Sequence, residues 1–270
     1  MANLDLIFAP VEKVKVSDIL PGYAAPKGKS HFLVVDTPKG KRIANMCSDN
    51  YGLIPNEKLL VPFMEGLDKM GLKYNYEVKH RNYTQFFVDF IFDQSNFDMG
   101  TTKHPDMVYA KLRWQNSYDL SLRYGLLAGI WRKICSNGMM GFDQMEAMRR
   151  IHTTDFAAIS LSETMDLVNN FLENTADIIE PFEILKERPI LMDELEEFID
   201  ETIEFTNFPK KQREVTLERI IMEKNLTNEL TGWQVYSGFN YQLNHNEEIN
   251  MSIPKKQKLD LELIDHISYS

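Results

Sequence analysis

The sequence predicts an α+β protein with a central antiparallel β-sheet, flanking helices and an all-helical C-terminal part. Three runs between residues 72 and 114 alternate apolar and polar side chains, a period of two that is typical of strands. After residue 154, apolar residues recur every three or four positions, which is typical of amphipathic helices. The 270 residues are 43% hydrophobic and 11% aromatic, enough to build a sizeable core.

Composition along the chain divides it into four segments. Residues 1–30 are punctuated by proline and glycine and are expected to form an extended N-terminal lead-in. Residues 31–153 are expected to form the β-rich α+β core, and residues 154–245 a helical part packed on that core. Residues 246–270 contain Pro254 within a basic run and are expected to form an extended tail.

The first ordered elements are a hairpin and a helix. The β-rich runs 31–36 and 41–46 flank Thr37-Pro38-Lys39-Gly40, which predicts two strands joined by a turn. Apolar residues at helical spacing then predict a helix that Asn56 caps, that runs to about Met70 and that Gly71 ends.

Three strands are predicted at residues 72–78, 86–92 and 108–114. The third has an apolar face (Val108, Ala110, Leu112, Trp114) and a face that carries Tyr109, Lys111, Arg113 and Gln115. Solvent exposure of one face of an antiparallel sheet explains such a row. Contact with nucleic acid would also explain it, because cations neutralise phosphates and aromatic rings stack on bases.

The segment 122–134 is ambiguous. Its leucines and isoleucines recur every four residues, which favours a helix, but Gly125, Gly129 and the cations between them weaken that interpretation. Strand and helix both remain open here.

Four helical stripes are predicted in the C-terminal part. The first begins at the capping box of residues 160–163 and ends before Pro181. The second spans about 192–205, the third starts near Pro209, and the fourth holds Trp233, Tyr236 and Phe239. Such stripes are typical of core packing.

The net charge is −10 and is unevenly distributed. Residues 100–153 hold eight lysines and arginines against four acidic residues, whereas residues 154–206 hold fifteen acidic residues against two basic ones. Solvated helix faces explain this pattern; the sharper alternative is that the basic middle meets phosphates.

Several classes of protein lack support. The chain has two cysteines, no zinc-ligand spacing, no signal peptide and no apolar run of membrane-spanning length, so we expect a soluble, cytoplasmic protein without membrane partner, metal or cofactor. The loop Gly22–Ser30 ends in Gly-Lys-Ser like a phosphate-binding loop, but five residues separate its glycines where four are required. No motif identifies catalytic residues, so we expect no enzymatic turnover, although a hydrolase or nuclease with dispersed ligands stays an alternative.

Two stretches of the sequence resemble a phage- and plasmid-borne family named "domain of unknown function 932". The first comprises residues 116–119 (Asn-Ser-Tyr-Asp) and 128–138, which end in Cys-Ser-Asn-Gly. The second comprises residues 232–238 (Gly-Trp-Gln-Val-Tyr-Ser-Gly) with Asn244-His245; residues 151–153 also fit, and the likeness covers about residues 30–245. Tyr118 stands where the family usually has His, and Trp131 where it usually has Phe.

The resemblance implies a role by association. Members look like mobile-element genes that often lie beside DNA-repair-type genes, which suggests single-strand DNA binding and annealing by a homo-oligomer. Annealing requires a basic path and stacking rings rather than catalytic residues. The residues expected to line that path are Tyr109, Lys111, Arg113, Arg123, Arg132, Lys133, Arg149 and Arg150.

Two alternatives compete with the DNA role. Arg123 and Arg132 could be buried structural cations paired with Asp119 or Asp143. The whole protein could instead be a protein-interaction module, a counter-defence or host-takeover factor that binds a host protein through its acidic helices, including Glu194, Glu197 and Glu201.

Overall fold

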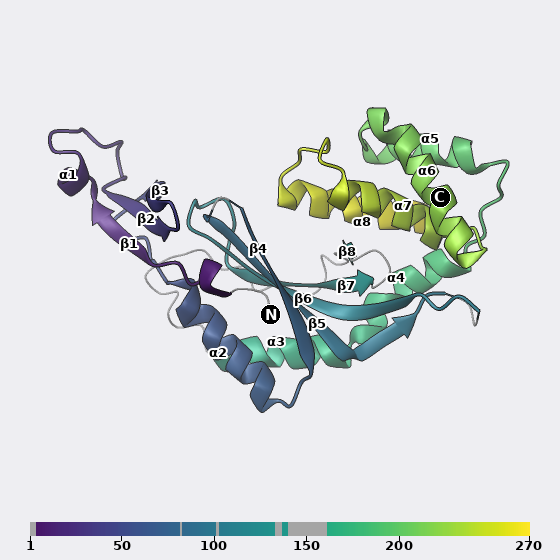
Figure 1. Ribbon diagram of the computed structural model, residues 1–270, viewed down its shortest axis with the longest axis horizontal. Coiled ribbons are helices and arrows are strands. Elements are labelled where there is room, and N and C mark those ends of the chain that lie inside the picture. The colour runs from purple at the N-terminus through teal and green to yellow at the C-terminus, as the bar shows by residue number, and fades with distance from the viewer. Residues whose placement is uncertain (1–3, 82, 101–102, 133–136, 140–160) are drawn as a thin grey trace. The chain divides into compact units, whose positions relative to one another are not determined.

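The computed structural model describes residues 4–81, 83–100, 103–132, 137–139 and 161–270 (Figure 1). These ranges form two antiparallel sheets and a helical C-terminal part, which confirms the α+β class. The chain clusters into two compact units: residues 1–94, 112–127 and 144–171 form the first, and residues 95–111, 128–143 and 172–270 form the second.

A three-stranded antiparallel sheet lies in the first unit, in the order β1 (Val11–Lys15), β2 (His31–Thr37), β3 (Gly40–Cys47). Thr37 pairs with Gly40, so the predicted hairpin is confirmed. Part of the expected lead-in is strand β1, and it is followed by the one-turn helix α1 (Val16–Ile19).

Both faces of this small sheet are covered. Phe32 and Val34 of β2 form a cluster with Val16 that Val14, Ala25 and Met46 complete. Leu33 and Val35 point to the opposite face and are also buried. The continuous apolar run of β2 is therefore explained by a strand enclosed from both sides.

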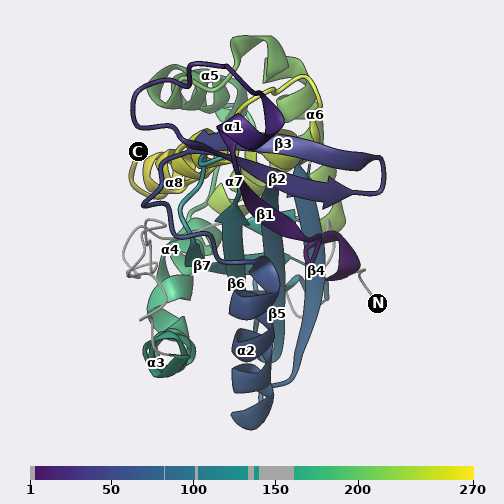
Figure 2. The same ribbon diagram turned by 90° about the vertical axis from the view of Figure 1, so that its left-hand side faces the viewer.

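The second sheet has the strand order β4-β5-β6-β7-β8. Its strands are β4 (Tyr74–Arg81), β5 (Gln85–Asp98), β6 (Met107–Ser117), β7 (Gly125–Arg132) and β8 (Asn137–Met139). Helix α2 (Asn56–Lys69) runs along the strands in Figure 2, and its Phe63 meets Phe90 of β5 edge-to-face at 5.2 Å. The three strands predicted between residues 72 and 114 are thus confirmed, each somewhat longer than expected.

The ambiguous segment 122–134 contains strand β7, so the helical interpretation is wrong. All residues of β7 except Trp131 are buried. A strand buried on both faces carries apolar residues without alternation, and the four-residue spacing of its leucines and isoleucines then imitates a helix.

Six helices form the described C-terminal part: α3 (Leu161–Glu173), α4 (Thr175–Glu187), α5 (Leu195–Thr206), α6 (Arg213–Thr227), α7 (Gly232–His245) and α8 (Ile253–Tyr269). The first predicted stripe is two helices, and Pro181 lies inside α4 instead of after its end. Buried Ile179, Phe182 and Leu185 anchor α4 on both sides of the proline.

The expected extended tail is helix α8, which corrects the prediction for residues 246–270. Pro254 occupies the first turn, where a missing backbone N–H costs no helical hydrogen bond. Leu259, Leu263 and Ile267 are buried and hold the helix in place. No helix in the described part of the chain has the length and apolar character needed to cross a bilayer.

Candidate nucleic-acid interface

The row expected to meet DNA lies mostly in the interior. Lys111 and Arg132 are 0% exposed, and the Arg113 side chain is 12% exposed. The ring of Tyr109 packs at 5.7 Å from that of Trp131, and Arg123 is exposed. Lys133, Arg149 and Arg150 lie outside the described residues. The polar face of β6, predicted to be open to solvent, is therefore covered: Lys111 and Gln115 are buried, and Tyr109 and Arg113 are half-buried. Neither Lys111 nor Arg132 is exposed to a ligand.

Arg113 is engaged in an ion pair within the sheet. Its Nε and Nη2 donate to the two carboxylate oxygens of Asp89 on β5 at 2.5 and 2.6 Å. The guanidinium also lies 5.6 Å above the ring centroid of Phe87. Burial acts to lower the pKa of Arg113, but the Asp89 carboxylate outweighs burial and raises it. The positive charge is thus already compensated by the protein.

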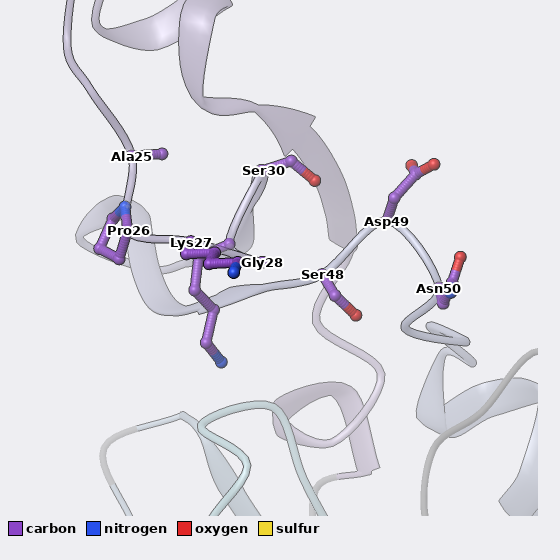
Figure 3. Close-up of a pocket in the computed structure, with 9 residues that line it drawn as sticks. Ala25, Pro26, Lys27, Gly28, Ser30, Ser48, Asp49 and Asn50 are labelled. Atoms are coloured by element: carbon purple, nitrogen blue, oxygen red, sulfur yellow. The ribbon is translucent and has the colours of Figure 1, made fainter.

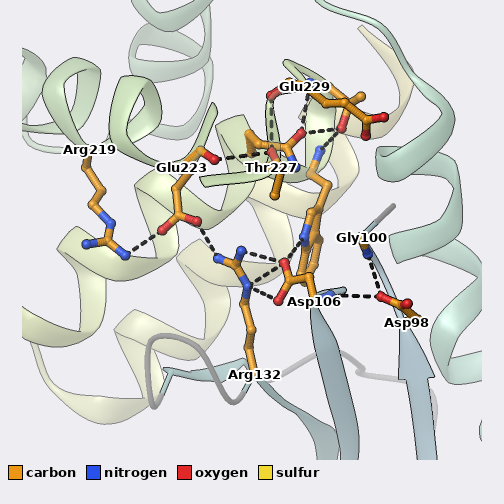
Figure 4. Close-up of polar contacts among 11 residues, drawn as sticks. Asp98, Gly100, Asp106, Arg132, Arg219, Glu223, Thr227 and Glu229 are labelled. Carbon is orange, nitrogen blue, oxygen red and sulfur yellow. Dashed lines mark hydrogen bonds and ion pairs between the residues drawn. The ribbon is translucent and has the colours of Figure 1, made fainter. Parts of the chain in front are cut away.

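Arg132 is the centre of a fully buried ionic network in the second unit (Figure 4). Its Nε and Nη2 donate to Asp106 at 2.5–2.8 Å, and its Nη1 donates to Oε2 of Glu223 on α6 at 2.8 Å. Asp106 also accepts a hydrogen bond of 2.8 Å from Nε1 of Trp233 on α7. Arg219 pairs with Glu223 from the preceding turn of α6, at 2.5 Å.

This network settles the alternative left open for Arg132. Two carboxylates and two guanidiniums neutralise one another, and the Arg132 guanidinium lies 5.3 Å above the Trp233 ring. Arg132 is a buried structural cation, as one alternative held, and it pairs with Asp106 and Glu223. Asp143, one of the two partners expected from the sequence, lies outside the described residues. The sequence spacing gave no signal for Glu223, which lies 91 residues away.

A second network surrounds the Asn-Ser-Tyr-Asp stretch in the first unit. The buried Tyr118 hydroxyl accepts from the backbone N–H of Asn56 at 2.8 Å, and Asn116 Nδ2 donates to Asn56 Oδ1 at 2.7 Å. Asn56 also donates to the Ile7 carbonyl at 3.0 Å. Asn56 is therefore not the helix cap that the sequence predicts: Pro55 holds the cap position of α2, and the Asn56 side chain binds core groups.

Asp119 closes the turn after β6. It accepts hydrogen bonds from Ser121, from the Thr84 hydroxyl at 2.9 Å and from the Gln85 amide at 3.1 Å. Burial acts to raise the pKa of Asp119, but these donors together outweigh burial and hold the pKa below 3.8. The carboxylate is therefore held in its ionised form by the groups of the turn.

Exposed cations gather elsewhere, on the three-stranded sheet. Residues 11–47 hold seven lysines and arginines against three acidic residues. Five of the cations are exposed: Lys15, Lys27, Lys39, Lys41 and Arg42. Tyr23 lies in the same segment and is 52% exposed. We name these six residues the basic lobe. A count of charged residues over positions 11–47 would have indicated this surface from the sequence.

A pocket of 480 Å³, open to solvent, adjoins the basic lobe. Figure 3 shows the loop around Lys27 and Gly28 on one side and residues 48–50 on the other. Lys29 lines the pocket and donates to the Met46 carbonyl at 3.1 Å, and Ser30 and Ser48 add hydroxyls. The loop that imitates a phosphate-binding motif thus lies at an accessible, cation-bearing surface, but strand β2 follows it where that motif has a helix.

Metal and thiol chemistry find little support in the described ranges. No three His, Cys, Asp or Glu side chains gather there in a way that could hold a metal ion. Cys47 is buried, and its burial raises the pKa of the thiol, which disfavours the reactive thiolate. Cys135 lies outside the described residues.

Comparison with known proteins places the chain in a family of unsettled role. No curated protein and no solved structure matches it. The family described as "Domain of unknown function (DUF932)" matches residues 44–261, which include both stretches that build the buried networks. The chain therefore belongs to the domain of unknown function 932 family.

Proposed function

We propose that the protein binds and anneals single-stranded DNA as an oligomer, without catalytic turnover, in the cytoplasm of a cell that hosts a phage or other mobile element. The observation that carries the proposal is the basic lobe, where five exposed cations and the exposed ring of Tyr23 share one small sheet and its loop. Cations bind the phosphate backbone without regard to sequence, and an exposed ring offers a surface for base stacking.

The lobe replaces most of the path expected from the sequence. Lys41 pairs with Glu12 at 2.6 Å, but both side chains are more than half exposed. Such a surface pair contributes little stability, and a phosphate can take the place of the carboxylate. Arg123 is exposed as well and remains a candidate contact.

Open sheet edges support the oligomer. Within the described residues, β1 and β3 each pair with β2 alone, so each leaves one edge unpaired. Unpaired edges are templates for strand addition from another chain. Edge-to-edge pairing would align the basic lobes of successive protomers into a continuous path for a strand.

The test is fluorescence anisotropy of a labelled oligothymidine at two salt concentrations, with light scattering on the same samples. We expect salt-sensitive binding by a species larger than a monomer. The double variant Lys27→Glu/Lys39→Glu should weaken binding and reduce the salt slope by about 0.7 for each lost phosphate contact.

The matched control is Lys103→Glu/Lys255→Glu, which changes the net charge equally at exposed lysines outside the lobe. It should bind almost as the wild type does. No binding by the wild type, or equal losses in the two double variants, would overturn the proposal.

A further inference from the structure

Helices α5 and α8 of the second unit, labelled in Figure 1, expose two aromatic rings. Phe205 is 61% exposed and Tyr269 is 70% exposed. The buried side of α5 includes Phe198, Ile199 and Ile203, and Phe205 is not among its buried residues. Exposed aromatic rings of this size are enriched where proteins bind partners.

The two helices are joined by stacked rings. His266 of α8 stacks on Phe205 at 4.5 Å with an interplanar angle of 18°. The other neighbour of His266 is Phe198, at 6.2 Å and 15°, and the guanidinium of Arg188 lies 4.9 Å above Phe198. Phe205 is thus held in a defined orientation with one side against the stack and the rest exposed.

A stripe of carboxylates lies on α5, the helix that carries Phe205. Glu194, Glu197, Glu201 and Glu204 follow one another at intervals of three or four residues, which places them on one side of α5. All four are exposed, and none makes an ion pair with another described residue. By contrast, Glu196 and Asp200 on the neighbouring side share an ion-pair partner, Arg213, at 3.0 and 2.5 Å.

The uncompensated stripe costs the helix stability, because like charges at this spacing repel one another. A positive partner would remove the repulsion. We name the two rings and the four glutamates the α5–α8 face.

We infer that the α5–α8 face binds an arginine-bearing segment of a partner protein. A guanidinium stacks on an aromatic ring and pairs with carboxylates at the same time. The described part of the same unit holds arginines on rings three times: Arg132 on Trp233, Arg188 on Phe198, and Arg219 on Tyr241 at 3.8 Å. The four negative charges repel nucleic acid and anionic lipid. They also disfavour a second copy, because a two-fold contact would bring the stripe against itself.

The probe is a fluorescein-labelled helical peptide with four arginines spaced three and four residues apart and leucines between them. Its twin carries citrulline, which is uncharged but similar in shape, in place of each arginine. We expect the arginine peptide to bind the full chain and the citrulline peptide to bind at least about tenfold more weakly.

Two variants and two matched controls locate the site. Phe205→Ala and Glu197→Gln/Glu201→Gln should each weaken binding about tenfold. Met222→Ala, which truncates a side chain 55% exposed on α6, and Glu218→Gln/Glu229→Gln, which removes equal charge from exposed positions, should bind as the wild type does. Circular dichroism checks that each variant is folded.

If the variants and their controls weaken binding of the arginine peptide equally, the attraction comes from net charge alone and the inference is overturned. Equal binding of the arginine and citrulline peptides would also overturn it. The Lys27→Glu/Lys39→Glu variant should bind the arginine peptide normally, so that failure here is separate from failure of the DNA proposal.

Discussion

The sequence identifies Arg132 correctly as a cation in an apolar run. The residue was expected on a DNA path, but it lies in a buried ionic network. A cation inside an apolar run requires compensation, and the sequence makes that requirement visible. Its partners are Asp106, in the loop before β6, and Glu223 of α6, which only the folded chain brings together. The two family stretches at residues 128–138 and 232–238 meet there through Arg132 and Trp233. In this chain, residues from both stretches therefore build a buried ionic network of the core.

Removing the Arg132 charge should destabilise the protein strongly. In Arg132→Met the buried Asp106 loses its guanidinium partner, and we expect the free energy of unfolding to fall by about 3–5 kcal/mol. Urea denaturation followed by circular dichroism measures the loss. The control is Arg123→Met, an exposed arginine in the same region, which should change stability by less than about 0.5 kcal/mol. Equal denaturation midpoints for Arg132→Met and the wild type would refute the structural role.

At the scale of elements, the sequence predicts those in which apolar residues keep a regular period. The strands at 74–81, 85–98 and 107–117 alternate apolar with polar residues over part of their length, and α5 buries one side, so the hydrophobic period identifies them. Helix α7 is buried on nearly all sides, but its aromatic residues still recur at a helical spacing. The period does not identify strand β7, because both of its faces are buried. The burial of the polar row on β6 is not predicted either, because the residues that cover a sheet face can be distant in sequence.

Two helical glycines differ in what a methyl group would meet. A Cβ at Gly238 of α7 would lie 2.3 Å from Cγ1 of Ile220 and 3.2 Å from its backbone nitrogen, whereas at Gly66 of α2 it would meet the end of the flexible Met165 side chain. Gly238→Ala should therefore lower stability by about 1–3 kcal/mol through overpacking. Gly66→Ala should be neutral or gain up to about 1 kcal/mol from helix propensity, because Met165 can move aside.

Thermal unfolding of the two alanine variants beside the wild type tests this contrast. Equal melting temperatures for Gly238→Ala and Gly66→Ala would show that α6 and α7 separate easily. They would then not form the close contact that the absence of a side chain at residue 238 allows.

For the whole molecule, charge is distributed by region. The basic lobe belongs to residues 11–47, and the acidic stripe belongs to α5 of the second unit. The net charge of −10 therefore describes neither surface. One chain can therefore offer one surface to a polyanion and another to a basic segment. Binding at each surface should depend on salt independently of the other.

The two units should nevertheless unfold together, because β5, β6 and β7 each contribute residues to both. Because each of these strands is continuous, loss of its ladder hydrogen bonds in one unit should weaken the adjoining ladder hydrogen bonds in the other. Incorporation of 5-fluorotryptophan gives a ¹⁹F signal for Trp114 in the first unit and for Trp233 in the second. We expect both native resonances to disappear at the same urea concentration, with conservative Phe substitutions used only to assign the signals. A Trp233 resonance that persists after that of Trp114 is lost would instead show that the second unit is stable without the first, and that the shared strands do not couple them.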